Sequence, residues 1–416
     1  MMLCLLAAHD DGDQPVSIAA MWMSRRAWPL PVVLSYAAFI LVGVSAGVGG
    51  VLLPAQIRDY DIDMATIGLT FFTFSAGFFL AGTSAGALIG RLGTRSALLA
   101  GGAGYLVAVL ITAARPSFVV LVVVQVLAGY GIGVLESVLN VYLSGLPSAT
   151  VLLNRLHAFF GVGALLGPLL AAWMLRSWRW TSVFLVLAAL TAALLVGFAG
   201  VLPRHHEPAP RSVVRRSPRD GLLAQVLRRP AVMLAAAFLS VYVGLEVSVG
   251  NWAFTYLVQD QAQLALAAGY AVSAYWLGLT VGRFVISPLA GRLGLTPQRM
   301  MLCCLMGVVG ATAVTWAVRG QLAGVGFALV GFFLGPLFPT AMALVPDLTT
   351  ATLVPTAIGV LNAVSVLGGA ALPWLAAAIA QGMGIWTLLP YVAVLGVVQL
   401  VLWQAAVGRA EVRAPR

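Results

Sequence analysis

Two acidic residues, Glu136 and Glu246, lie deep within long apolar runs of the sequence. A carboxylate in an apolar environment costs several kcal/mol unless it is protonated, paired or hydrated, so such residues usually serve a function. A buried carboxyl group that alternates between its neutral and charged forms can carry a proton. The sequence therefore predicts a proton-coupling role for both glutamates, although each could instead hold helices together through a hydrogen bond.

A stripe of polar residues and glycines accompanies the first glutamate. Gln125, Gly129, Gly133, Glu136 and Asn140 follow one another at spacings of three and four, which places them on one face of a helix. Amides beside an apolar surface suit a solute that carries hydroxyl groups. We expect Gln125 and Asn140 to bind substrate, and the alternative is a polar contact between helices.

Other candidate solute-binding residues lie in four further apolar runs. Arg283 cannot lose its charge, so it needs Glu136, Glu246 or a substrate oxygen as a partner, unless it reaches the membrane surface. Glu246 and Arg283 are expected to form one electrostatic unit in the second half of the chain. His157 could join a proton path or simply pack. The remaining predicted substrate-binding residues are Tyr242, Asn251, Trp252, Tyr275 and the buried amide Asn362.

Several kinds of chemistry are excluded by what the sequence lacks. It contains no G-x-x-x-x-G-K loop, no metal-ligand cluster and no nucleophile–base pair, and all 23 of its basic residues are Arg. The three cysteines form neither a disulfide framework nor a metal site. We therefore predict no ATP-driven pump, no enzyme, no catalytic residue, no metal and no cofactor. A solute sensor is disfavoured because no signalling domain is appended.

The elements that must position these residues are membrane-spanning helices. The chain is 61% hydrophobic and 9% charged, with a mean hydropathy of +1.00, which a soluble domain of this length cannot carry. A bilayer core of about 30 Å takes about 20 residues per helix. The predicted spans are 31–53, 66–89, 97–114, 118–144, 156–175, 181–202, 231–257, 264–289, 300–318, 321–346, 354–378 and 386–407. This predicts an all-α membrane protein of twelve transmembrane helices.

The arginines predict the orientation of these helices in the membrane. If both termini are cytoplasmic, seventeen arginines fall on the inner side and five on the outer side. Basic loops beside lipid headgroups are ordinary, so no nucleic-acid partner is expected. We predict a monomer in the inner (plasma) membrane. Its expected parts are a disordered cytoplasmic tail 1–26, a six-helix bundle 27–202, a cytoplasmic linker 203–229, a second bundle 230–407 and a cytoplasmic tail 408–416.

The two predicted bundles repeat each other in sequence. The tetrapeptide Gly-Arg-Leu-Gly at 90–93 recurs at 291–294, an offset of 201 residues. A weaker echo relates Gly167-Pro168 to Leu372-Pro373 at an offset of 205. These echoes indicate duplication of a six-helix unit. Parallel repeats of this kind place a substrate site near the bilayer midplane, between the halves.

The spans, the central basic segment and the repeated turns together resemble the major facilitator superfamily over residues 31–407. The loop Gly86–Arg95 is similar to that superfamily's signature between spans two and three, with Gly90 in place of the usual acid, so a charge relay is not expected there. More specific motifs resemble the sugar:proton symporters that include fucose permease. They are Gly133-Val-Leu-Glu136-Ser-Val-Leu-Asn140, Tyr242-Val-Gly, Gly282-Arg283-Phe284 and Phe338-Pro339-Thr340.

This resemblance implies a two-bundle fold and a role for Glu136 in proton coupling. The first span departs from fucose permease, because Gly50 stands ahead of Val51-Leu-Leu-Pro54 where that protein has an acid. We therefore expect a secondary transporter, most simply a proton-coupled symporter of a monosaccharide or similar polar metabolite. The alternative is a proton-coupled efflux antiporter for amphiphilic compounds or drugs, because the run from Gly161 through Pro168 resembles the signature of drug:proton antiporters.

Overall fold

The computed structural model describes residues 29–203, 221–318, 320 and 322–411. Within these residues the chain is helical and contains no strand. Eleven segments are long and apolar enough to cross a membrane, and the longest, Met64–Ala113, has 50 residues. That segment bends at Gly93, whose positive φ of 79° interrupts the helix, so it holds two spans. The predicted all-α architecture of twelve transmembrane helices is confirmed.

The N-terminal half begins with a long helix that runs beyond its predicted end. It consists of α2 (Leu30–Tyr60), α3 (Met64–Ile67), α4 (Leu69–Ala113), α5 (Phe118–Ser144), α6 (Ala149–Met174) and α7 (Thr181–Val201). Pro54 lies inside α2 and does not end it, so the helix continues past residue 53. The short α3 starts where the Asp63 side chain accepts a hydrogen bond from Thr66 N–H at 2.7 Å, a typical N-cap.

The C-terminal half follows the same plan, with one span broken into two helices. It consists of α10 (Pro230–Gln259), α11 (Ala265–Arg292), α12 (Pro297–Ala317), α13 (Leu322–Leu334), α14 (Leu337–Ala343), α15 (Val345–Leu348), α16 (Val354–Met383), η1 (Ile385–Thr387) and α17 (Leu388–Glu411). The break between α13 and α14 falls at Pro336, which has no N–H to continue the helix.

The predicted tails and linker are described only in part. The predicted tail 1–26, most of the predicted linker 203–229 and the end of the predicted tail 408–416 lie outside the described residues. Within the linker, the structure has a short helix, α9 (Leu222–Leu227). The last helix, α17, reaches Glu411, beyond the predicted boundary at residue 407.

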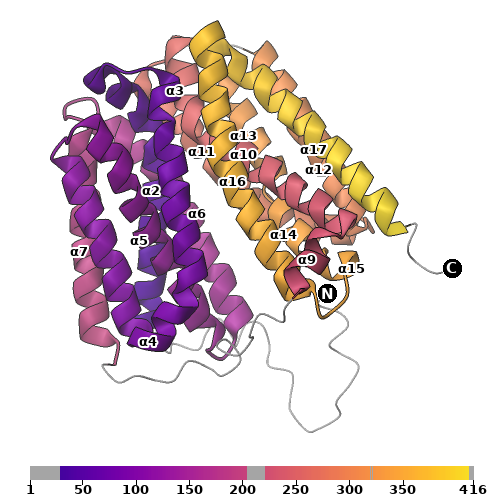
Figure 1. Cartoon of the computed structure of the whole chain (residues 1–416). Coiled ribbons are helices and arrows are strands. Elements are labelled where there is room, and N and C mark those ends of the chain that lie inside the picture. The colour runs from indigo at the N-terminus through magenta and orange to yellow at the C-terminus, as the bar shows by residue number, and fades with distance from the viewer. Residues whose placement is uncertain (1–28, 204–220, 319, 321, 412–416) are drawn as a thin grey trace.

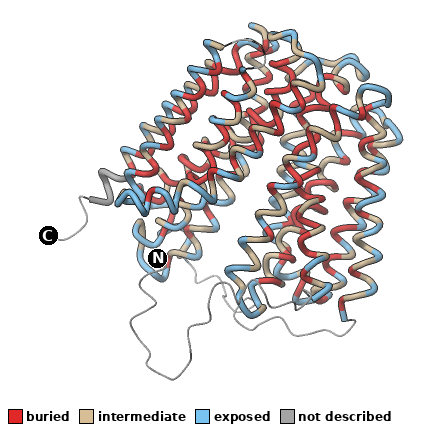
Figure 2. Tube along the Cα trace, turned by 180° about the vertical axis from the view of Figure 1, so that it is seen from behind, coloured by how far each residue is buried: buried red, intermediate tan, exposed pale blue. Residues whose placement is uncertain are grey.

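The two halves meet at one end of the molecule and diverge toward the other (Figure 1). The far end is the one where α2 finishes and α3 begins, and the linker end is the one where α7 finishes and α10 begins. At the far end, Met64 N–H donates to the Gln381 side chain of the other half at 2.9 Å. Buried residues run along the interior of each half, with exposed residues on the outside and at the helix ends (Figure 2).

Glycines at matching positions bring the same helix pairs together in each half. A Cβ atom on Gly77 would meet a backbone carbonyl oxygen of α5, and one on Gly278, 201 residues later, would meet a carbonyl oxygen of α13. Gly129 and Gly331 make the reciprocal contacts from the partner helices. Only a residue without a side chain permits such close approach of two backbones. The duplication indicated by the repeated tetrapeptides is therefore present in the packing.

Candidate functional site

A cavity of about 350 Å³ lies between the halves, in the part of the molecule nearer the far end. Its walls come from α2, α4, α5 and α7 on one side and from α10, α11 and α16 on the other. The lining residues with hydrogen-bonding side chains are Ser45, Gln56, Thr70, Ser75, Tyr105, Thr112, Gln125, Asn251 and Trp276. The described lining contains no charged residue. Such a cavity suits a small, uncharged solute.

One face of α2 forms much of the N-terminal wall. Ser45, Gly49, Leu52 and Gln56 follow one another at spacings of four and three, so they share a helix face. The Tyr105 hydroxyl group, on the second span of α4, donates a hydrogen bond to Ser45 Oγ at 2.8 Å. Ser45 Oγ therefore accepts one hydrogen bond, and its own O–H group remains available to donate another.

The predicted polar stripe on α5 is divided in the structure. Gln125 lines the cavity, whereas Gly129 and Gly133 press against α4. Glu136 is partly buried and lies about 16 Å further along the helix, at 1.5 Å per residue. The Asn140 side-chain amide donates to the Glu136 backbone carbonyl oxygen at 2.8 Å. The structure therefore brings Gln125 to the cavity and leaves Glu136 and Asn140 outside its lining.

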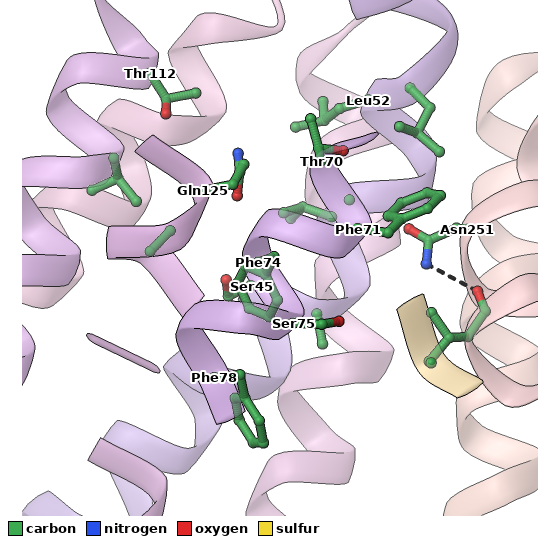
Figure 3. A pocket seen from close by; sticks show the side chains of 18 of the residues that line it. Ser45, Leu52, Thr70, Phe71, Phe74, Ser75, Phe78, Thr112, Gln125 and Asn251 are labelled. Atoms are coloured by element: carbon green, nitrogen blue, oxygen red, sulfur yellow. Dashed lines mark hydrogen bonds between the residues drawn. The ribbon is translucent and has the colours of Figure 1, made fainter. Parts of the chain in front are cut away.

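The C-terminal wall supplies one amide and one indole. Asn251 donates to the Val247 carbonyl oxygen at 2.9 Å, which leaves its side-chain oxygen available (Figure 3). Trp276 is 7% exposed, and its indole N–H has no hydrogen-bond partner among the described residues. Figure 3 places Gln125 and Thr112 on one side of the cavity and Asn251 on the other. Polar groups thus face the space from opposite halves.

A second polar cluster lies in the C-terminal half, outside the cavity lining. Arg283 Nη2 is 3.8 Å from Glu246 Oε1, and the two side chains are 29% and 14% exposed. The pairing expected from the sequence is therefore present. Tyr242 and Tyr275 are fully buried, and Tyr275 donates to the Glu246 backbone carbonyl oxygen at 3.0 Å. None of these four residues lines the cavity.

His157 lies on α6 in the N-terminal half. Its side chain is exposed, and its ring makes an edge contact with Phe39 at 5.5 Å between ring centres. The structure therefore places His157 outside the cavity lining.

Aromatic side chains from both halves meet at the far end. Phe71 contacts the ring of Trp252 at 6.2 Å, and Phe72 contacts Trp374 at 5.9 Å, measured between ring centres. Trp252 is fully buried, and its indole donates to the Pro373 carbonyl oxygen at 2.9 Å. Trp252 is therefore part of the contact that closes the far end, and it does not line the cavity.

Asn362 was expected to be a buried amide, and this expectation is wrong. The residue is exposed on α16. It lies one turn before Val366 and two turns before Gly369, which both line the cavity, so it shares their helix face. Along α16 (Val354–Met383), Asn362 lies on the side of these two residues away from Gln381 at the far end.

Most polar residues of the N-terminal wall were not predicted from the sequence. Ser45, Gln56, Ser75, Tyr105 and Thr112 all line the cavity, and none was predicted. A signal was available, because Ser45 and Gln56 stand three helical turns apart on one face of an otherwise apolar helix. Ser45, Ser75, Tyr105 and Thr112 carry hydroxyl groups, which are common in membrane helices, and Gln56 lies beyond the predicted span 31–53.

Comparison with known proteins gives one family. The sequence profile of the Major Facilitator Superfamily matches residues 34–373. The chain is 27% identical over 393 residues to "Bypass of stop codon protein 6" of Saccharomyces cerevisiae, covering 86% of this chain and 78% of that protein. It is 25% identical to the glucose/mannose transporter GlcP of Bacillus subtilis, covering 74% of this chain and 78% of the relative.

The fold also matches a solved structure. The fucose:proton symporter FucP of E. coli superimposes with a TM-score of 0.60 at 16% sequence identity, covering 92% of this chain and 99% of that one. At this identity the match concerns the fold alone.

Proposed function

The chain belongs to the major facilitator superfamily and is a multi-pass membrane transporter rather than an enzyme, and on that premise we propose that it is a proton-coupled symporter of a monosaccharide or a similar neutral polar metabolite. The observation that carries the substrate class is the cavity, which has amides and hydroxyl groups but no charged residue in its described lining. Sugars need paired donors and acceptors beside an apolar surface. The name of the glucose/mannose transporter from Bacillus subtilis supports the same class.

Glu136 is the proposed proton carrier. The ion pairs among the described residues are Arg115 with Asp59 and Arg283 with Glu246, and neither includes Glu136. A carboxyl group without a charged partner in a membrane bundle is most stable when it is neutral, so it takes up a proton readily. Its partial exposure supports exchange of that proton.

The proposed orientation places the linker end in the cytoplasm. Among described side chains, the linker end carries Arg91, Arg95, Arg155, Arg228, Arg229, Arg292 and Arg299, and the far end carries Arg58, Arg115, Arg176 and Arg179. The larger group belongs on the cytoplasmic side of a plasma membrane. In this orientation the structure is closed toward the outside by the far-end contacts, and rocking of the halves would expose the cavity to the other side.

Uptake by purified protein in proteoliposomes tests the proposal. An imposed pH gradient, acidic outside, should drive accumulation of one or more radiolabelled hexoses or pentoses above the external concentration. A protonophore should abolish the accumulation and leave exchange of labelled for unlabelled sugar intact. Accumulation that persists in the presence of the protonophore would refute proton coupling, and the absence of sugar flux would refute the substrate class.

Efflux of amphiphilic compounds is the second candidate, and one observation favours it. Phe71, Phe74, Phe78 and Phe184 contribute a large apolar part of the cavity wall, which would also suit a flat apolar ligand. The same proteoliposomes decide between the two. Export of a lipophilic dye driven by a pH gradient, without sugar uptake, would establish the second candidate.

A further inference from the structure

The cavity is not shared equally by the two halves. The C-terminal half contributes six lining residues, Val243, Val247, Asn251, Trp276, Val366 and Gly369, and every other lining residue belongs to α2, α4, α5 or α7. The contribution of α7 is informative, because this helix packs against α2 and α4 of its own half. Its residues Phe184 and Leu187 nevertheless line the cavity. The space therefore extends behind α2, into the interior of the N-terminal bundle.

The polar side chains in this interior part have unused hydrogen-bonding groups. Gln56 is 8% exposed and Gln125 is half-buried, and neither makes a hydrogen bond to another described residue. Because both amides line the cavity, their free hydrogen-bonding groups are available to a ligand or to water there. Ser45 adds an oriented O–H group, because its oxygen already accepts from Tyr105.

The groups in this interior part are all uncharged, and they are separate from the ionisable ones. Glu136 lies about 16 Å along α5 from Gln125, at 1.5 Å per residue, and the Glu246–Arg283 pair does not line the cavity. A charged ligand would meet no opposite charge here, and burying it would be unfavourable. Phe74 and Phe78 instead offer apolar surface beside the amides, which matches a ring with C–H faces and hydroxyl edges.

We propose that the specificity pocket of this transporter lies inside its N-terminal half, formed by Ser45, Gln56, Thr112 and Gln125 with Tyr105 as a positioning residue, and that it binds a neutral polyhydroxylated ring. The C-terminal residues Asn251 and Trp276 close over the exposed side of that ring. The inference rests on the proposed function, because it takes the cavity to be the place where the transported solute binds. It goes further by assigning discrimination among solutes to one half.

Binding of tritiated D-glucose to purified full-length protein, with its monodeoxy analogues as competitors, tests the assignment. Gln125→Met keeps the volume of the side chain and removes its hydrogen bonds. Loss of one such bond should weaken glucose binding roughly tenfold. The decisive measurement compares the affinities for glucose and for each monodeoxy analogue, on the natural protein and on Gln125→Met. One monodeoxy analogue that binds more weakly than glucose to the natural protein should bind as well as glucose to Gln125→Met.

Two further variants make the result specific. Gln399 is a matched control, because it is a fully buried amide on α17 with no hydrogen-bond partner among the described residues and no place in the cavity lining. Gln399→Met should leave both affinity and discrimination unchanged. Ser45→Ala should abolish discrimination at a different hydroxyl group of the sugar, because Ser45 contributes a separate donor.

The possible outcomes separate this inference from the proposed function. If Gln125→Met and Ser45→Ala retain full discrimination while Asn251→Leu loses it, the pocket is in the wrong half, although the sugar assignment stands. If the natural protein binds and moves no sugar but exports a dye, the proposed function and the hydroxyl-recognising pocket are both overturned. Loss of discrimination confined to Gln125→Met and Ser45→Ala supports the inference.

Discussion

The two halves share a scaffold but treat their buried carboxyl groups differently. In the N-terminal half Glu136 has no ion-pair partner among the described residues, whereas in the C-terminal half Glu246 is paired with Arg283 at 3.8 Å. The glycine contacts repeat at offsets of 201 and 202 residues, yet at the same offsets Arg283 corresponds to Gly82 and Glu136 to Phe338. Backbone packing was therefore retained after duplication while the polar groups diverged.

This difference suggests a division of roles between the halves. An unpaired carboxyl group can change its charge without breaking an ion pair, whereas a change at a paired one leaves its partner's charge uncompensated. The N-terminal half would then carry both the proton and the specificity pocket. The C-terminal half would supply a fixed electrostatic unit, the Glu246–Arg283 pair.

The largest expected effect comes from Glu136→Gln. The amide keeps the shape of the side chain but cannot exchange a proton, so sugar accumulation driven by a pH gradient should be abolished. Solute binding and counterflow should remain, because Glu136 does not line the cavity. Proteoliposome uptake measured with and without a pH gradient checks both parts. Undiminished uphill transport by this variant would remove Glu136 from the coupling role.

The next largest effect is expected from breaking the Glu246–Arg283 pair. Arg283→Gln alone should lower stability by about 3 kcal/mol, the lower end of the cost of breaking a buried pair, because the arginine is partly exposed. The double variant Glu246→Gln with Arg283→Gln leaves no unpaired charge and should regain most of the folded yield, though not necessarily transport. A double-mutant cycle on yield and thermal stability in detergent measures the coupling.

The same experiment sharpens the comparison between halves. Glu246→Gln should lower folded yield, because it leaves Arg283 unpaired, whereas Glu136→Gln should not. If the single changes at Glu246 and Arg283 add without coupling, the pair seen in the structure contributes nothing. Equal losses of yield for Glu136→Gln and Glu246→Gln would remove the difference between the two halves.

The shared scaffold gives a third, smaller prediction. Gly77→Ala and Gly278→Ala should each destabilise the protein by about 1–3 kcal/mol, since the added methyl group meets a backbone carbonyl oxygen of the neighbouring helix. Gly82→Ala and Gly310→Ala are matched controls, because nothing lies within 4 Å of a Cβ atom at either position. Thermal unfolding in detergent should show similar losses in both halves, and a loss in only one would argue against equivalent packing.

The sequence was sufficient for the helices because their signal is strong and local. Runs of apolar residues locate the spans, and the repeated Gly-Arg-Leu-Gly turns reveal the duplication. The Glu246–Arg283 pair was also predictable, because two lone opposite charges in an apolar half have few other partners. Boundaries were harder to place, and α6 begins at Ala149, seven residues before its predicted start.

The cavity was much less predictable, because it depends on which helix faces meet. Gln125 and Asn251 were identified as isolated amides, but hydroxyl groups such as Ser45 and Thr112 can bond to their own helix and therefore give no clear signal. Thr112 does so, donating to the Ala108 carbonyl oxygen at 2.9 Å. The exposure of Asn362 depends on how the helices pack, which no local pattern encodes.

The smallest effect compares one helix cap from each half. Asp63 accepts a hydrogen bond from Thr66 N–H at 2.7 Å, whereas Thr296, which caps α12, accepts one from Arg299 N–H at 3.3 Å. The bond from Thr66 holds the pKa of the Asp63 carboxyl group below its usual value. A carboxyl group with a lowered folded pKa stabilises the protein above its unfolded pKa of about 3.9, and this contribution is lost as the pH falls through the folded value.

Asp63→Ala should therefore lower stability by about 1 kcal/mol near neutral pH, and the loss should shrink below about pH 4. Thr296→Ala should cost less, because its hydrogen bond is longer, and its cost should not depend on pH. Thermal unfolding of both variants against the natural protein at several pH values checks this difference. Because Met64, the first residue of α3, donates to Gln381 of the other half, Asp63→Ala should also loosen the far-end contact. A pH-independent loss for Asp63→Ala would show that the charge of the carboxylate does not contribute to the cap.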